Sequence, residues 1–346
     1  MAKIPKRINP QTNLGDFFTE IEPRNPPRNW STYNQTQTNE KLLFLQLLSE
    51  LLDAYIEEPK TTYGRKPISM RDMIFCCCYV KYANLSSRRG VSELKLLQKQ
   101  GYIEQAPHFN TVLNYFKDKR IRLILKQLIL IAGLPLAQFE DVVAVDASGF
   151  GTSLYSKWLS VREHAGKRKD YRKVHISTGV KTNVVTAIEV SEGARHDSPY
   201  FEGLVRITSS NFSIKQVLAD MGYTSKTNMN VADELGIVPL IPFKKNATGR
   251  ARGSLMWKKM YAYYTEHYDE FMKYYHLRSN VESTFSMVKR KFGTRVRTKN
   301  GVSQDNEILC IFLCHNIVQV IKAVFDFGLF PDFEKMCKKA DCTLIS

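Results

Sequence analysis

The sequence predicts an α/β protein, with a mixed five-stranded sheet flanked by helices and an all-α domain before it. Two observations support this fold class. Residues 40–135 carry leucines and other apolar residues at the three- and four-residue spacing of helices. After Phe139, short β-branched runs appear, first three in succession and then alternating with helical segments. Such an order of elements is typical of a mixed sheet with helices on both faces.

The first third of the chain carries the helical pattern. Residues 1–38 are rich in Pro, Asn, Thr and Gln, and we expect them to form a flexible polar arm. Further on, apolar residues recur at helical spacing until Gly101 breaks the pattern, and they resume after Pro107. The expected helices cover about 40–56, 69–82, 92 to the break at 101, 111–117 and 121–132.

Residues 91–117 have the order of short helix, glycine-containing turn and second short helix. This order is typical of a helix-turn-helix-like DNA-binding unit, although any small helical bundle would show it. Asn110 is expected to cap the second helix. The residues that could contact DNA here, or equally form a solvated face, are His108, Asn110, Thr111, Asn114 and Lys117.

The remainder of the chain should form the sheet and its helices. We expect strands at about 141–146, 171–181, 183–190, 214–219 and 237–241, and helices at about 197–207 and 224–235. The predicted organisation is a polar arm at 1–38, a helical DNA-binding domain at 39–137, an α/β catalytic domain at 138–325 and a C-terminal tail at 326–346.

The charge balance points to a polyanionic partner. The chain has 50 Lys and Arg against 34 Asp and Glu, a formal net charge of +16. An excess of this size on a soluble enzyme most often accompanies nucleic-acid binding. A generally basic protein of the ribosomal type is the alternative.

The seven cysteines indicate a reducing compartment, because three of them are consecutive at 76–78 and cannot build a disulfide framework. Cys310, Cys314 and His315 could be interpreted as metal ligands, but they lie in an apolar helical run and are expected to pack in the core. No signal peptide is visible, and no run is expected to approach the roughly 20 apolar residues of a membrane span. We expect a soluble, cytoplasmic, nucleoid-associated protein.

Two aspartates follow apolar strands. Asp146 ends the run from 141, and Asp220 ends the run from 214. Adjacent parallel strands would place the two acids side by side, where they would repel each other unless a divalent metal lay between them. Taken singly, each is more simply a turn residue or a helix cap.

A third acid lies in an unusual helical stripe. Tyr275, Arg278, Glu282 and Lys289 are spaced by three, four and seven residues, which brings them to one face of a helix. The alternative for Glu282 is structural, because residues 279–282 fit a capping box. That interpretation leaves the other three residues and the basic stretch after Lys289 unexplained.

Tyr275, Arg278, Glu282 and Lys289 match the Tyr-x2-Arg-x3-Glu-x6-Lys signature, and this part of the chain resembles the insertion-sequence DDE transposases, in their related groups four and five. The family's two aspartates match Asp146 in AVDASG and Asp220 in VLADMGY. The resemblance covers roughly residues 140–320 and is looser in the helical N-terminal region.

The resemblance implies a ribonuclease-H-like core that binds two Mg²⁺ ions, with Mn²⁺ as a possible substitute. Asp146 would bridge both ions, and Asp220 and Glu282 would each hold one. One ion would activate the attacking water or DNA 3′-hydroxyl, and the other would stabilise the leaving oxygen. Tyr275, Arg278 and Lys289 would contact phosphates near the cut.

The implied function is cleavage at the terminal inverted repeats of an insertion sequence and transfer of the strands to target DNA, carried out by a homodimer on double-stranded DNA. Basic residues at 157–181 and 289–299 fit a DNA track. The short interval from Asp220 to Glu282 leaves room only for a helical insertion at about 255–274. Two alternatives remain: a domesticated or inactive descendant that only binds DNA, and a nuclease with the same core, such as a Holliday-junction resolvase.

Overall fold

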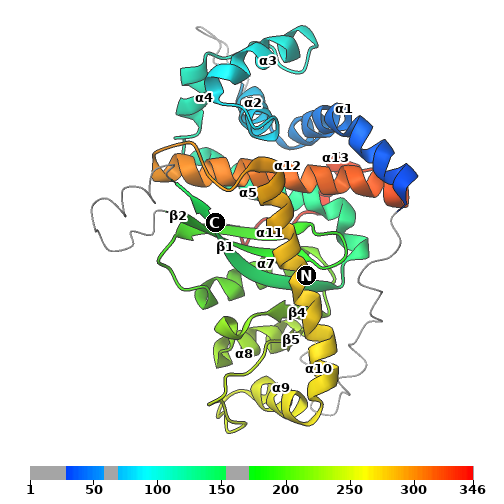
Figure 1. The fold of residues 1–346 in the computed structure, drawn as a ribbon, viewed down its shortest axis with the longest axis vertical. Coiled ribbons are helices and arrows are strands. Elements are labelled where there is room, and N and C mark those ends of the chain that lie inside the picture. The colour runs from blue at the N-terminus through cyan, green and yellow to red at the C-terminus, as the bar shows by residue number, and fades with distance from the viewer. Residues whose placement is uncertain (1–28, 58–68, 153–170, 346) are drawn as a thin grey trace.

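The computed structural model describes residues 29–57, 69–152 and 171–345, and a five-stranded sheet lies at its centre (Figure 1). The strand order is β3-β2-β1-β4-β5, with β1, β2 and β3 antiparallel and β1, β4 and β5 parallel. The strands are β1 (Val142–Gly151), β2 (Tyr171–Gly179), β3 (Val185–Glu192), β4 (Gln216–Ala219) and β5 (Val238–Leu240). The predicted mixed sheet with flanking helices is confirmed, and its arrangement is ribonuclease-H-like.

Strand β1 is longer than expected. Residues 143–145 pair with both β2 and β4, whereas the residues after Val145 pair with β2, because β4 ends at Ala219. The last of them, Gly151, also forms a bridge with Arg295. The expectation that Asp146 ends a strand was therefore wrong. Asp146 lies in the middle of β1, at the point where the neighbouring parallel strand stops.

Helices cover both faces of the sheet. The face that carries Phe150 packs against α12, with the rings of Phe150 and Phe312 6.0 Å apart. On the other face, the ring of His175 stacks on Tyr200, just before α7, at 3.9 Å. Helices around the sheet are α5 (Arg120–Gly133), α7 (Phe201–Asn211), α8 (Lys226–Leu235), α11 (Ser279–Phe292) and α12 (Gly301–Phe327).

Helix α12 is the centre of the packing. It lies between the N-terminal helices and the sheet in Figure 1, and most of its side chains are buried. The stretches Arg120–Phe139 and Gly301–Phe327 are, by length and composition alone, long and apolar enough to cross a membrane, so the expectation that no run approaches that length was wrong. Their most apolar windows are 67% and 78% buried inside the protein, as in the core helices of a soluble protein.

The N-terminal helices differ from the prediction at their starts. Helix α1 begins at Trp30, where the Asn29 side chain caps it, rather than near residue 40. Helix α3 begins at Ser87 rather than near residue 92, and α4 is capped by His108 rather than by Asn110. The helices of this region are α1 (Trp30–Tyr55), α2 (Met70–Tyr82), α3 (Ser87–Lys99) and α4 (Phe109–Tyr115).

Several polar contacts join the N-terminal helices to the rest of the fold, and three of them involve charged side chains. Lys81 Nζ lies 2.6 Å from Glu307 Oε1, and both side chains are almost fully buried. Lys291 at the end of α11 pairs with Glu40 of α1 at 2.6 Å. Arg297 donates to the carbonyl and side-chain oxygens of Asn84 at 3.0 and 2.9 Å. The helical region is therefore fixed directly to α11, to α12 and to the segment between them.

The interval from Asp220 to Glu282 holds a helical insertion, as expected. It consists of α9 (Leu255–Glu266) and α10 (Tyr268–Tyr275), and these described residues contain no inserted β-domain. A last helix, α13 (Phe333–Lys339), lies within the segment expected to be a tail.

The cysteines play the expected structural part. All seven are free, and those at 76–78, 310 and 314 are buried. His315 is buried and its Nε2 donates to the Asn183 carbonyl at 2.8 Å. Burial, with a smaller contribution from Lys291, lowers the pKa of His315 to about 4 despite the opposing Asn183 hydrogen bond.

Candidate active site

The sheet register places Asp146 beside Asp220. Strands β1 and β4 are parallel, with Val145 opposite Ala219, so the residues that follow are neighbours. Each acid has one oxygen fixed by the backbone: Asp146 Oδ1 accepts from Ala147 N at 2.8 Å, and Asp220 Oδ1 accepts from Gly222 N at 2.7 Å. The predicted adjacency of the two strands is confirmed.

The surroundings of Asp146 shift its pKa. Its side chain is 20% exposed, and burial raises the pKa of Asp146, with the negative charge of Asp220 adding to this effect. The Ala147 N–H and the Arg278 guanidinium act in the opposite direction. Two carboxylates held this close favour a cation between or beside them.

Arg278 connects Asp146 to Glu282. Its Nη1 donates to Asp146 Oδ2 at 3.0 Å, and its Nη2 donates to Glu282 Oε1 at 2.5 Å. Because one planar guanidinium contacts both, all three side chains meet at the point where α11 crosses β1. The Arg278 side chain is 18% exposed there, whereas Glu282 is 59% exposed.

The stripe from Tyr275 to Lys289 does not lie on one continuous α-helix. Tyr275 is the last residue of α10, a 3-10 turn (His276–Arg278) follows, and α11 then carries Glu282 and Lys289. The three elements run nearly in line in Figure 1. The capping-box interpretation is contradicted, because α11 has no side-chain cap and Glu282 accepts from Arg278.

Tyr275 and Lys289 flank the acids. The Arg278 guanidinium lies 5.9 Å from the centre of the Tyr275 ring. Burial raises the pKa of Tyr275, with Asp220 and Asp146 adding to the effect against the opposing charge of Arg278. Lys289 Nζ donates to Ser148 Oγ on β1 at 2.7 Å, and burial lowers the pKa of Lys289. The pattern of the sequence did not indicate Ser148 as a partner, because no local spacing links the two residues.

The chemistry of these groups fits a hard divalent cation. Carboxylate oxygens are the preferred protein ligands of Mg²⁺ and Mn²⁺, and the three acids come from elements that meet at one strand end. Within residues 29–57, 69–152 and 171–345, however, no three His, Cys, Asp or Glu side chains are gathered closely enough to hold a metal ion as they stand. Arg278 supplies the positive charge between Asp146 and Glu282 in this arrangement.

The basic side chains of the two stretches that were expected to follow DNA differ in their partners. Residues 157–170 of the first basic stretch lie outside the described part of the chain. Of its described members, Arg172 pairs with Asp305, Lys173 with Asp197 and Lys181 with Asp141. In the second stretch, Lys291 and Arg297 hold the N-terminal helices, as described above. Three further members of that stretch, Arg290, Arg295 and Lys299, are exposed as well.

Helices α2 and α3 form a helix–turn–helix with a short turn. It lies nearer the N-terminus than the unit predicted at residues 91–117. Residues 83–86 join these two helices, whereas residues 100–108 separate α3 from α4. Gly90 allows the close approach, because a Cβ there would lie 2.8 Å from Val80 Cγ2. Helix α2 is buried, and α3 exposes four basic side chains, those of Arg88, Arg89, Lys95 and Lys99.

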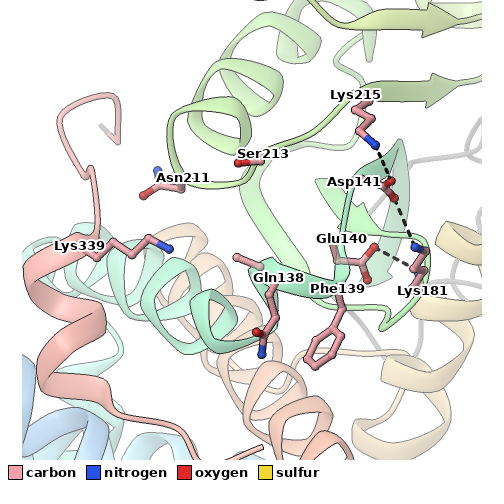
Figure 2. A pocket seen from close by; sticks show the side chains of 10 residues that line it. Gln138, Phe139, Glu140, Asp141, Lys181, Asn211, Ser213, Lys215 and Lys339 are labelled. Carbon is pink, nitrogen blue, oxygen red and sulfur yellow. Dashed lines mark hydrogen bonds and ion pairs between the residues drawn. The ribbon is translucent and has the colours of Figure 1, made fainter. Parts of the chain in front are cut away.

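A cavity of about 410 Å³ lies at the opposite end of β1, near its first residue (Figure 2). Lys181 and Lys215 extend toward Asp141 from two sides, each with its Nζ 3.5 Å from a carboxylate oxygen. The single negative charge of Asp141 offsets part of the positive charge of the two lysines. The cavity lacks Asp146, Asp220 and Glu282, and we assign it no part in the chemistry.

Comparisons with known proteins identify the family of this chain and a relative. Residues 137–317 match the family model described as the transposase DDE domain. A probable transposase for insertion sequence element ISA1214 from Archaeoglobus fulgidus is 26% identical over 217 residues, which are 61% of this chain and 63% of that protein. The aligned region thus spans less than two thirds of that relative.

Proposed function

The chain belongs to the transposase DDE-domain family, and from this premise we propose that it binds the terminal inverted repeats of an insertion sequence and catalyses metal-dependent DNA cleavage and strand transfer. The observation that carries the proposal is the β1–β4 register, which sets Asp146 beside Asp220, while Arg278 connects Asp146 to Glu282. Three acids from separate elements thereby converge at one strand end.

Asp146, Asp220 and Glu282 are the proposed ligands of two Mg²⁺ ions, for which Mn²⁺ can substitute. Bound there, the ions supply activation of the attacking hydroxyl and stabilisation of the leaving oxygen. Asp146 and Asp220 are pre-oriented by the Ala147 and Gly222 N–H groups. Glu282 is the most exposed of the three and can reorient once Arg278 releases it.

Tyr275, Arg278 and Lys289 are the proposed contacts to DNA phosphates near the cut. Arg278 offers a planar pair of donors that suits a phosphate as well as a carboxylate. Lys289 has three N–H donors, and Ser148 takes one of them, which leaves two for a phosphate. A phosphate that attracts Arg278 away from Glu282 would free that carboxylate at the moment DNA is present.

Recognition of the element's ends is assigned to the N-terminal helices. The exposed basic face of α3, carried on the buried helix α2, has the arrangement by which helix-turn-helix units present a recognition helix. The contact between Arg297 and Asn84 joins the α2–α3 turn to the chain segment after α11. Since two ends must be brought together, a homodimer on double-stranded DNA is the expected assembly.

The test is a cleavage and strand-transfer assay with DNA that carries the inverted repeats flanking the gene. Wild-type protein should nick at the repeat ends and join the new 3′-hydroxyl groups to a target duplex when Mg²⁺ is present. Asp146→Ala, Asp220→Ala and Glu282→Ala should each abolish cleavage and keep DNA binding. Wild-type cleavage by any of the three would contradict the assignment of that residue.

The same assay separates the alternatives. Repeat binding without cleavage in either metal would support a protein that only binds DNA. Cleavage of branched DNA without strand-transfer products would support a junction nuclease with the same core.

A further inference from the structure

Tyr223 carries a buried hydroxyl group without a hydrogen-bond partner among the described residues. The residue lies three positions after Asp220, at the end of a short 3-10 turn (Met221–Tyr223), and is 1% exposed. Its Oη is buried and accepts or donates no hydrogen bond in the described part of the chain. Leaving a buried hydroxyl unsatisfied costs free energy, so such a group in a folded protein requires an explanation.

The position of Tyr223 is well determined by its surroundings. Its N–H donates to the Asp220 carbonyl at 3.1 Å, and its carbonyl accepts from Asn228 Nδ2 at 2.8 Å. Asn228 also donates to Ser198 Oγ at 3.1 Å, which joins this turn to the segment before α7. The lack of a partner therefore does not come from a loosely held side chain.

Charged groups act on the Tyr223 hydroxyl: the carboxylates of Asp197, Asp146 and Asp220 and, with the opposite sign, the guanidinium of Arg278. Burial raises the pKa of Tyr223, and the negative charges of Asp197, Asp146 and Asp220 raise it further. The phenol therefore keeps its proton, and toward carboxylates it can act only as a hydrogen-bond donor.

Asp197 already has partners of its own. Its Oδ1 lies 2.5 Å from Lys173 Nζ and 3.4 Å from His175 Nδ1. The His175 ring is in turn fixed by Ser191 Oγ at 2.8 Å and by the stacked ring of Tyr200. By contrast, the backbone occupies only Oδ1 of Asp220, which leaves Oδ2 for a further donor.

We propose that Tyr223 is a positioning residue, whose hydroxyl donates to Asp220 when the carboxylates hold a divalent cation. The proposal rests on the metal-binding role assigned above. A donor to the outer oxygen of a ligating carboxylate fixes its orientation and strengthens its binding. The unpaired hydroxyl is then a cost that the metal-free protein carries and that disappears when the site is assembled.

The experiment compares full-length wild-type protein with Tyr223→Phe by calorimetric titration with Mn²⁺ and by thermal unfolding without divalent cations. The variant should melt at the same temperature as wild type or higher, because it lacks an unsatisfied buried group. Its affinity for Mn²⁺ should fall by about 10-fold or more. An affinity within about twofold of wild type would overturn the proposal, and so would a lower melting temperature, which would show that the hydroxyl is bonded within the metal-free fold.

Tyr79→Phe is the matched control. Tyr79 is equally buried at 1% exposure, but it lies on α2 and its hydroxyl donates to Glu93 at 2.8 Å. This variant should melt at a lower temperature and bind Mn²⁺ as wild type does. Mn²⁺ binding at the proposed site must be present in wild type and lost in Asp146→Ala. If wild type shows no such binding, the proposed function fails, and this inference fails with it. If wild type binds and Tyr223→Phe binds equally, the inference alone fails.

Discussion

The guanidinium of Arg278 lies 3.0 Å from Oδ2 of Asp146, and its other terminal nitrogen contacts Glu282. Two acids that are far apart in the sequence are thus joined by one cation. In the metal-free protein, this cation offsets the repulsion between Asp146 and Asp220. Binding of metal and release of Arg278 to DNA are therefore expected to be coupled.

Replacement of Arg278 should expose this coupling. Arg278→Ala leaves Asp146 without its counter-charge at a site only one-fifth exposed, so metal-free protein should lose about 1–3 kcal/mol of unfolding free energy. Added Mn²⁺ should stabilise the variant more than wild type. Urea unfolding with and without Mn²⁺ measures both effects. Arg206→Ala, which removes solvent-accessible ion pairs with Glu202 and Glu234, should change stability by less than about 1 kcal/mol. Equal stability of metal-free Arg278→Ala and wild type would contradict the role of Arg278.

Three exposed basic residues, Arg290 in the last turn of α11 and Arg295 and Lys299 after it, should carry part of the DNA affinity. The triple variant Arg290→Ala, Arg295→Ala and Lys299→Ala should bind duplex DNA with a weaker salt dependence, because the slope of log K against log salt decreases by about 0.9 for each phosphate that the protein no longer neutralises. Its melting temperature should stay unchanged, because all three side chains are exposed. Fluorescence anisotropy across a salt series gives the slope. Lys291→Ala is the control with the opposite pattern. Its melting temperature should fall, because its ion pair with Glu40 is removed. An unchanged slope in the triple variant would exclude this surface.

Removal of Glu307 should lower the free energy of unfolding more than removal of its buried partner Lys81. Glu307 also accepts from the N–H groups of Arg297 and Thr298, each at 2.9 Å. Glu307→Met leaves those donors and Lys81 unpaired, and it should cost about 3–5 kcal/mol. Lys81→Met should cost less, since Glu307 keeps two donors. Denaturant unfolding checks the order, and Asp326→Asn, in an exposed pair with Lys322, serves as the control near zero. The opposite order would show that Lys81 has the larger structural role.

The free energy of unfolding should fall in mild acid, partly because His315 is buried in its neutral form. The unfolded chain binds a proton at this residue near its ordinary pKa of 6.5, whereas the folded protein binds it only near a pKa of about 4. The unfolded state therefore holds more protons in this window, and the free energy of unfolding falls as the pH falls from 6.5 to 4. The loss can reach about 3 kcal/mol.

The His315→Gln variant isolates this contribution. Glutamine can still donate to the Asn183 carbonyl, but it does not titrate. The difference in unfolding free energy between variant and wild type should therefore change with pH between 6.5 and 4, while buried carboxyls with raised pKa values, such as Glu140, contribute equally to both. A difference that is constant with pH would contradict the buried neutral state of His315.

The sequence predicted the sheet and the placement of the two aspartates because both depend on short-range patterns. The β-branched runs that precede Asp146 and Asp220 identify buried strands, and the structure sets β1 and β4 side by side and parallel. The adjacency of the acids follows from that register. The end of β1 could not be predicted in the same way, because its second half is stabilised by pairing with β2 rather than by its own apolar residues.

The rest depends on contacts between distant segments. Residues 279–282 satisfy the local pattern of a capping box, yet Glu282 is held by Arg278, which Asp146 orients from another element. The polar start of α1 resembles an unstructured arm until its later turns pack against α12. Similarly, Lys289 and Lys291 belong to one basic run, but Ser148 and Glu40 give them separate structural roles. No spacing within the sequence contains this information.

The most direct test of the central claim is the rate of strand cleavage by Glu282→Ala on repeat-end DNA, measured beside wild type at a protein concentration that saturates binding. If Glu282 completes the metal site with Asp146 and Asp220, cleavage should fall by at least about 100-fold in both Mg²⁺ and Mn²⁺ while DNA affinity is retained. Cleavage at the wild-type rate would contradict the account, since the glutamate would then be only the partner of Arg278.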